Sequence, residues 1–335
     1  MDWDLILSVS LTTAIGPTAV VSCLAAMGLN VHFGYTGLVN FGQVGFVAIG
    51  AYTVAMGVDT YGWSIWLCFF LALFTASMLA LILGVPTLRL RADYLAIVTI
   101  AAGEIIRLTL RAARFRATTG GAAGIQGFAG DFFDVSPLSG SEYAFDIPGT
   151  SIGVEYNSSQ MWVLIVGWTL VALTAVLTHF LVRSPWGRVV KAIREDEDAV
   201  RSLGKNVYAF KMQALVVGGV IGAVGGVLFA LGRQSVAPDS LGTALTFSFY
   251  VILVLGGAAR VVGPVVGAVI FFFLYGFIDV ALRQAIGADY ITFLVANEVG
   301  IFRQALVGLG LMVLMIFRPQ GVIGDKNEVA VSVRR

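Results

Sequence analysis

Residues 64–84 read SIWLCFFLALFTASMLALILG, with no Asp, Glu, Lys or Arg among them. A helix rises 1.5 Å per residue, so about 20 apolar residues are needed to cross roughly 30 Å of hydrocarbon. This stretch therefore predicts a membrane-spanning helix. Its apolar residues are continuous, whereas a membrane β-strand would show strict alternation over roughly ten residues.

Similar apolar runs recur along the whole chain, at 5–29, 35–58, 93–112, 160–182, 208–231, 242–258, 262–282 and 299–317. Of the 335 residues, 58% are hydrophobic and 12% are charged, which leaves too few polar groups to cover a soluble globule. We expect an all-α fold, a polytopic transmembrane helical bundle with about nine spans. Residues 1–335 are predicted to form this single transmembrane domain.

The counts of charged, cysteine and histidine residues exclude several other classes. The net charge of +1 gives no basic field for a nucleic acid. Cys23 and Cys68 both lie in apolar runs and are too few for a disulfide framework or a thiolate metal site. His32 and His179 are isolated from each other in the sequence, so we predict no metal site and interpret them as packing residues.

Lys and Arg residues in the loops predict the orientation, because they favour the cytoplasmic side. The tail, residues 318–335, and the segment of about 184–206 are rich in them and are expected inside, as are Arg89 and Arg91. The acidic loop of about 117–159 and the N-terminus are expected outside. The N-terminus begins with acidic residues, unlike a secretory signal peptide. One group disagrees with this orientation: Arg107, Arg111, Arg114 and Arg116.

Two glycine-rich stretches predict interrupted helices. Residues 34–52 read GYTGLVNFGQVGFVAIGAY, and residues 254–270 read VLGGAARVVGPVVGAVI. Irregular backbone at membrane depth is tolerated only where protein or water satisfies it, and paired interruptions in the two halves of a chain are typical of transport pathways. The candidates for lining a pathway here are Thr36, Asn40, Gln43, Gly256 and Gly257.

Glu104 and Arg107 are three residues apart and share a helix face. An intramembrane carboxylate is costly unless it is paired, so this pair is a further candidate for lining the pathway. A structural ion pair that fixes the helix is the favoured explanation, and a pathway-lining role is the alternative. Asp279 and Arg283, four residues apart, present the same alternatives.

The segment 184–204 reads SPWGRVVKAIREDEDAVRSLG and predicts a cytoplasmic helix. Pro185 can begin a helix and Gly204 can end one. The segment is either a solvated loop helix or a docking element for a cytoplasmic partner. A metal-diphosphate site at the acidic run 195–198, as in membrane prenyl transferases, is disfavoured because there is one contiguous run amid basic residues.

Part of this segment is similar to the coupling loop of ABC importer permeases, Glu-Ala-Ala followed by three residues and Gly. Here Asp198-Ala199-Val200 precedes Gly204 by the same spacing. The whole chain resembles the LivM type of high-affinity branched-chain amino acid permease. The matching stretches follow the order of that family: residues 34–52, ADYLAIVTIAAGEIIRL (92–108), TTGGAAGI (118–125), 184–204, 254–270 and RPQGVIG (318–324). The Ile-x-Leu-Pro of the general ABC pattern is absent after Gly204.

The resemblance implies a permease subunit of an ATP-driven importer in a bacterial plasma (inner) membrane. Its implied partners are a second homologous permease, two cytoplasmic ATPase subunits and an extracytoplasmic substrate-binding protein. ATP and Mg would be bound by the ATPases, so no cofactor is expected in this chain. Gly204-Lys205 is the nearest approach to a phosphate loop, and Asn206 follows it. The residues implied in coupling to the ATPase are Arg188, Lys191, Arg194, Glu195, Asp198, Ala199 and Gly204.

Three other functions stay open at this point. The solute could be urea or a short amide in place of a branched-chain amino acid. A gradient-driven secondary transporter would use Glu104 as a proton carrier, and a membrane enzyme would act at residues 195–198. The docking element favours the ABC permease.

Overall fold

The computed structural model describes residues 2–88, 92–138, 140, 142–146, 152–288, 298–318 and 320–324. Arg89, Arg91 and the tail from residue 325 onward lie outside the described residues. Within the described part the chain is a bundle of helices with two small two-stranded sheets, which confirms the all-α class.

Among the described residues, five helices are long and apolar enough to cross a membrane. They are residues Pro17–Tyr35, α4 (Ile65–Thr87), α8 (Ser158–Arg183), α11 (Val207–Arg233) and α13 (Gly263–Gly287). The first of these consists of α2 (Pro17–Leu29) followed by the π-helix η1 (Asn30–Tyr35). The remaining runs contain shorter or less apolar helices: α1 (Trp3–Ile15), α3 (Gln43–Asp59), α5 (Ala92–Arg111), α12 (Thr243–Gly256) and α14 (Val299–Phe317). A multi-pass membrane bundle is therefore supported, and the count of nine spans stays a prediction.

The first predicted run, 5–29, is not one helix. Helix α1 ends at Ile15, Gly16 is extended (φ −66°, ψ 172°), and α2 begins at Pro17. Proline has no backbone N–H and is favoured in the first turn of a helix, where that group would have no partner. The prediction of a single helix was wrong because hydropathy does not register this Gly-Pro break.

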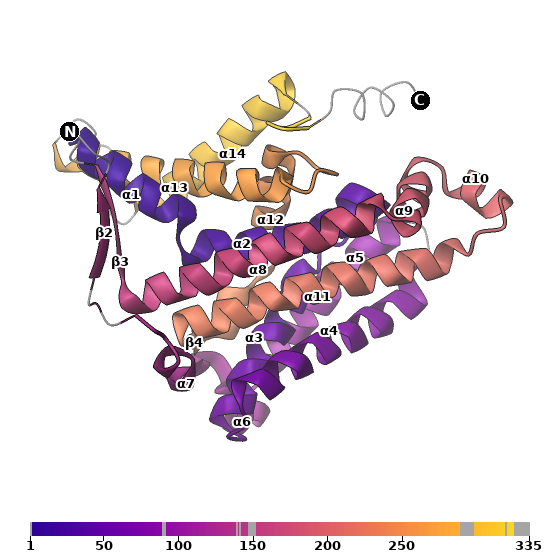
Figure 1. Ribbon diagram of the computed structural model, residues 1–335, viewed down its shortest axis with the longest axis horizontal. Helices are drawn as coiled ribbons and strands as arrows, with labels where there is room; N and C mark the ends of the chain where they lie inside the picture. The colour runs from indigo at the N-terminus through magenta and orange to yellow at the C-terminus, as the bar shows by residue number, and fades with distance from the viewer. Residues whose placement is uncertain are drawn as a thin grey trace.

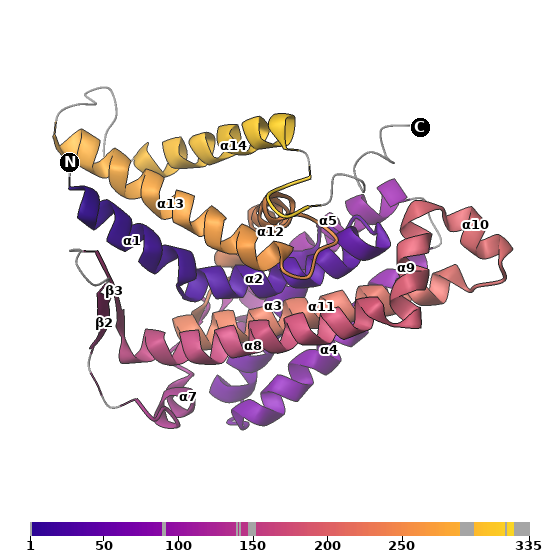
Figure 2. The same cartoon turned by 45° about the horizontal axis from the view of Figure 1, so that its top comes forward.

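Helix α11 lies at the centre of the bundle and packs against α2, α3 and α4 (Figures 1 and 2). Small residues allow the close approach of α11 to α3. An ideal Cβ on Gly50 would lie 2.2 Å from the carbonyl oxygen of Ala223, and one on Gly226 would lie 2.0 Å from that of Val47. Helices α1, α13 and α14 form a separate side of the bundle, where α1 packs along α13.

The two ends of the bundle carry different elements (Figure 1). One end carries the antiparallel hairpin of β2 (Glu142–Asp146) and β3 (Gly153–Asn157), which leads into α8 through a capping box formed by Asn157 and Gln160. The opposite end carries α9 (Pro185–Glu195) and α10 (Glu197–Ser202). The remaining short elements are η2 (Ala113–Phe115), α6 (Arg116–Thr119), η3 (Gly121–Ala123), α7 (Gly130–Asp134), η4 (Pro238–Leu241) and the paired strands β1 (Ile125–Gln126) and β4 (Ser235–Val236).

Candidate functional site

Both glycine-rich stretches are interrupted, as predicted. Helical structure in the first stops at Thr36, and α3 begins only at Gln43. Between them Gly37 has a φ of +73°, a conformation that L-residues with side chains rarely adopt. In the second stretch α12 ends at Gly256, Gly257 has a φ of +112°, and α13 begins at Gly263.

The π-helix η1, which leads into the first interruption, contacts the second interruption through Asn30, which is buried. Its side-chain amide donates to the carbonyl oxygen of Arg260 at 2.8 Å, and its Oδ1 accepts from the backbone N–H of Ala259 at 2.9 Å. An ideal Cβ on Gly34 would lie 2.7 Å from the nitrogen of Ala259, so only glycine allows this approach. The helix before the first break is therefore packed directly against the second break.

Asn40 and Gln43 are fully buried in a polar network. The amide of Asn40 lies 3.1 Å from Nδ1 of His32 and donates to Oε1 of Gln43 at 3.2 Å. Gln43 donates in turn to the carbonyl oxygens of Ala25 and Gly218, at 3.2 and 3.3 Å. These bonds give both amides a structural role, and their place on a pathway stays a prediction.

Gly256 and Gly257 are covered by the segment 320–324. The backbone N–H groups of Val322 and Ile323 donate to the carbonyl oxygens of Leu255 and Gly256, at 2.9 and 3.1 Å. An ideal Cβ on Gly257 would lie 2.7 Å from the nitrogen of Gly324. The glycines permit this backbone contact, and their role in lining a pathway also stays a prediction.

The predicted cytoplasmic helix is two helices. Asp196 is extended (φ −153°, ψ 102°), and its carboxylate accepts from the N–H groups of Asp198 and Ala199, at 3.1 and 3.0 Å. Asp is a preferred N-cap residue, so it ends α9 and begins α10. Gly204 follows α10 with a φ of +75°, in the left-handed region, and ends the helical segment as the sequence predicted. The prediction of one helix in the segment 184–204 was wrong because this internal cap was not recognised.

The residues predicted to couple to an ATPase divide into two groups. Arg194 points inward and donates from Nη1 to the carbonyl oxygen of Gly34 in η1. The others are on the exposed surface of α9, α10 and the turn after them: Arg188, Lys191, Glu195, Asp198, Ala199 and Gly204. Leu203 joins this surface with 79% exposure, and the sequence analysis missed it. An apolar residue at the tip of a charged turn was the available signal.

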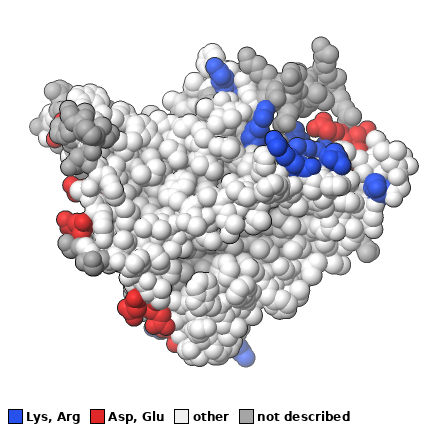
Figure 3. All heavy atoms as spheres, in the orientation of Figure 1, with Lys and Arg blue, Asp and Glu red and all other residues white. Residues whose placement is uncertain are grey.

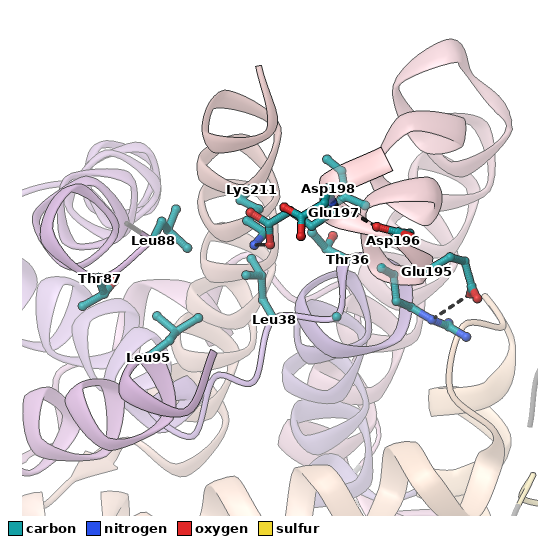
Figure 4. Close-up of a pocket in the computed structure, with 13 residues that line it drawn as sticks. Thr36, Leu38, Thr87, Leu88, Leu95, Glu195, Asp196, Glu197, Asp198 and Lys211 are labelled. Atoms are coloured by element: carbon teal, nitrogen blue, oxygen red, sulfur yellow. Dashed lines mark hydrogen bonds and ion pairs between the residues drawn. The ribbon is translucent and has the colours of Figure 1, made fainter. Parts of the chain in front are cut away.

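A cavity of about 370 Å³ lies between the junction of α9 and α10, the C-terminal end of α4 and the N-terminal end of α5 (Figure 4). Thr36, Gly37 and Leu38 of the first interruption line it. Figure 4 shows Leu88 and Leu95 on one side and the acidic run 195–198 on the other. Lys211 of α11 pairs with Glu197 at its edge.

Comparison with known proteins bears directly on this arrangement. Residues 12–317 match the family of branched-chain amino acid transport system permease components. The chain belongs to this family of permeases. It is 34% identical over 314 residues to the high-affinity branched-chain amino acid transport system permease protein LivM of Salmonella typhimurium. The aligned region covers 92% of this chain and 69% of that protein. LivM of Escherichia coli K12 is 33% identical, over 93% of this chain and 70% of its own.

The family match extends over both interruptions, α9 and α10. A more distant relative, a protein of Methanocaldococcus jannaschii that carries the LivM permease name, is 23% identical and covers 93% of each chain. The likeness to these permeases is therefore a property of the whole bundle.

This permease also contains two ionic clusters near the helix ends. Glu104 and Arg107 form the predicted pair, at 2.6 Å, and Arg107 also contacts Asp239 of η4 at 2.7 Å. Arg111 lies 3.3 Å from the same carboxylate. Sequence reasoning missed Asp239 because it is 132 residues from Arg107. The pair thus joins α5 to η4, which is a structural role. A role for Glu104 and Arg107 in lining the pathway stays a prediction.

The second cluster is centred on Asp279 of α13. Arg283 pairs with it at 2.9 Å as the sequence predicted, and Arg303 of α14 pairs with it at 2.5 Å. Arg303 also lies over the ring of Tyr275, 3.8 Å from its centroid. This cluster fixes α14 to α13.

Proposed function

We propose that this chain is the membrane permease subunit of an ATP-driven ABC importer of branched-chain or related amino acids. The observation that carries the proposal is the match of residues 12–317 to the permease family, together with relatives named LivM that cover more than nine-tenths of the chain. Those relatives are named for branched-chain amino acid transport, and the same solute class is proposed here.

The charge distribution supports an orientation with the N-terminus outside and the C-terminus in the cytoplasm. On the face drawn in Figure 3, a cluster of Lys and Arg lies at the end where α9 lies, with acidic side chains beside it, whereas the charges along the opposite end are mainly acidic and a broad uncharged band lies between the two ends. Positive residues favour the cytoplasmic side of a bacterial inner membrane, and the band suits hydrocarbon.

The exposed surface of α9 and α10 is the proposed docking site for a cytoplasmic ATPase. Interspersed charges of both signs suit a specific polar interface, and the exposed side chain of Leu203 can supply an apolar anchor. The same proposal includes a second permease, a second ATPase and an extracytoplasmic binding protein. ATP and Mg would be held by the ATPases.

Coupling is proposed to follow the contacts behind this surface. Arg194 connects α9 to Gly34 in η1, and Gly34 packs against Ala259 in the second interruption. A displacement of α9 by the ATPase would therefore reach both interruptions through direct contacts. Such coupling requires an element with two conformations, and binding of the ATPase at the docking surface shifts the equilibrium between them.

The test is uptake of leucine into proteoliposomes that hold the complete complex, with binding protein outside and ATP inside. We expect uptake that needs ATP and survives an uncoupler. Uptake that needs a proton gradient would support a secondary transporter, and uptake of urea or acetamide without leucine would reassign the solute. A matched complex with an ATPase that cannot hydrolyse ATP is the control.

A further inference from the structure

We propose that the cavity between α4, α5 and the α9–α10 junction is a binding site for an aliphatic amino acid, through which imported solute inhibits its own uptake from the cytoplasmic side. The inference rests on the proposed function, because it takes the imported solute and the orientation from there. It adds a second site for the same class of molecule, remote from the outer entrance.

The size and the apolar wall of the cavity suit an aliphatic side chain. Its volume of about 370 Å³ lies within the range of small-molecule sites. It is lined by Leu38 of the first interruption, Leu88 just after α4, Leu95 of α5 and Ile193 of α9. Burial of a branched aliphatic side chain against such a wall removes apolar surface from water and favours binding.

The opposite wall of the cavity offers both charges that an amino acid requires. Lys211 of α11 is only 16% exposed and pairs with Glu197 of α10. An α-carboxylate can take the place of Glu197 at the ammonium group, and an α-ammonium can take the place of Lys211 at the carboxylate. Asp196 and Asp198 lie beside this pair (Figure 4), and Arg201 pairs with Glu197 and Asp198 at 2.8 and 3.2 Å, so acidic groups outnumber the two cations at this wall.

The position of the cavity allows a bound molecule to affect the coupling between the ATPase and the permease. Its lining joins Glu195 and Asp198 of the proposed docking element to Thr36 in the first interruption and to Leu95 of α5. A ligand that bridges these elements stabilises the present arrangement of α9 and α10 against the bundle. Because a ligand shifts a conformational equilibrium toward the state that it binds better, occupancy would resist the movement that the ATPase must drive.

The test measures ATP hydrolysis and leucine uptake by the complete complex in proteoliposomes, with leucine added on the ATPase side. 4-Methylpentanoate and 3-methylbutylamine, which each lack one charged group, serve as comparison ligands. We expect leucine to inhibit and both analogues to inhibit less. In Lys211→Met we expect the inhibitory leucine concentration to rise by about tenfold or more, the effect of losing a charge-assisted contact. Lys205→Met, on the exposed turn outside the cavity, is the matched control.

Leu88→Trp fills the apolar side of the cavity and gives a second, independent variant. We expect it to raise the inhibitory concentration without removing either charge. Normal uptake by the wild type without inhibition would overturn this inference and leave the proposed function standing, whereas absence of ATP-driven uptake would overturn the proposed function itself. Equal inhibition in all variants, or slower uptake with unchanged inhibition, would also overturn the inference, the latter result indicating an exit step on the pathway.

Discussion

The guanidinium of Arg194, at the end of α9, donates a hydrogen bond to the main-chain carbonyl of Gly34 in η1. The ammonium of Lys191, one turn earlier, lies 5.6 Å from the centre of the Tyr35 ring. The helix that carries the proposed docking surface is thus attached to the interrupted segment by a charged hydrogen bond and a cation–π contact. Binding of the ATPase and transmission of its movement to the interrupted segment are therefore proposed to depend on different contacts, so each can be tested separately.

Arg194→Ala is expected to uncouple the complex without dissociating it. The side chain is 24% exposed, donates inward to Gly34 and also lies 3.6 Å from the carboxylate of Glu195, so its removal breaks the contact with η1 and leaves the exposed side chains of the docking surface present. We expect solute-stimulated ATP hydrolysis to fall by about fivefold, the factor that corresponds to ~1 kcal/mol. Arg188→Ala, on the exposed surface, is the matched control and should instead weaken co-purification of the ATPase. Loss of the ATPase from Arg194→Ala would contradict the division of roles.

Gly204→Val is expected to loosen the turn after α10. The φ of Gly204 is +75°, and no atom lies within 4 Å of an ideal Cβ there, so the effect comes from backbone strain alone. Left-handed backbone costs residues with a side chain roughly 1–2 kcal/mol. We expect faster tryptic cleavage at Arg201 and Lys205 in Gly204→Val than in Gly204→Asn, because Asn tolerates this conformation. Equal cleavage rates in the two variants would show that the turn adopts a different backbone conformation.

Glu195→Lys combined with Asp198→Lys is expected to reduce ATPase binding. Both carboxylates are exposed, Glu195 at 56% and Asp198 at 89% of their side-chain surface, so the change acts on the interface more than on the fold. Asp131→Lys combined with Asp134→Lys makes the same change of charge at the other end of the bundle. We expect co-purification of the ATPase to fall only in the first pair. A similar loss in both pairs would indicate a general effect of charge.

Cysteines placed at positions 40 and 43 test whether these buried amides reach the pathway. Both positions are fully buried in this structure, and the native Cys23 and Cys68 are buried as well. We expect no reaction with a small polar thiol reagent in the resting state and rapid reaction of Leu203→Cys. Labelling at 40 and 43 that appears in one nucleotide state would place them on the pathway. Absence of labelling in every nucleotide state, with transport intact, would remove them from it.

Local patterns in the sequence predicted most of the bundle. Long apolar runs identified where helices form, and the glycine, Thr, Asn and Gln mixture at 34–52 identified an interruption, because both signals lie within a few residues. The breaks at Gly16 and Asp196 were missed since apolar or charged composition continues across them. In each case one backbone position, a Gly-Pro junction or an Asp cap, decides the outcome.

Contacts between distant segments could not be predicted in this way. The partner of Arg107 on η4 and the two backbone partners of Asn30 near residue 260 depend on how the helices pack. The cavity beside Lys211 depends on packing as well, because its wall is assembled from the ends of elements that are separate in the sequence. For the candidate site, the sequence therefore indicated which segments matter and not which side chains face each other.

The pairing of α1 with α13 has a consequence for biosynthesis. The backbone N–H of Asp2 donates to Oε1 of Gln284 at 2.7 Å, and Nε2 of Gln284 donates to the carbonyl oxygen of Asp2 at 3.3 Å, across 282 residues. Because α1 is synthesised long before α13, it must stay in the lipid or beside the insertion machinery until α13 is inserted. The packing of α1 against α13 is therefore a late step of assembly. A chain truncated before residue 284 would leave α1 without this partner, and we expect it to be degraded.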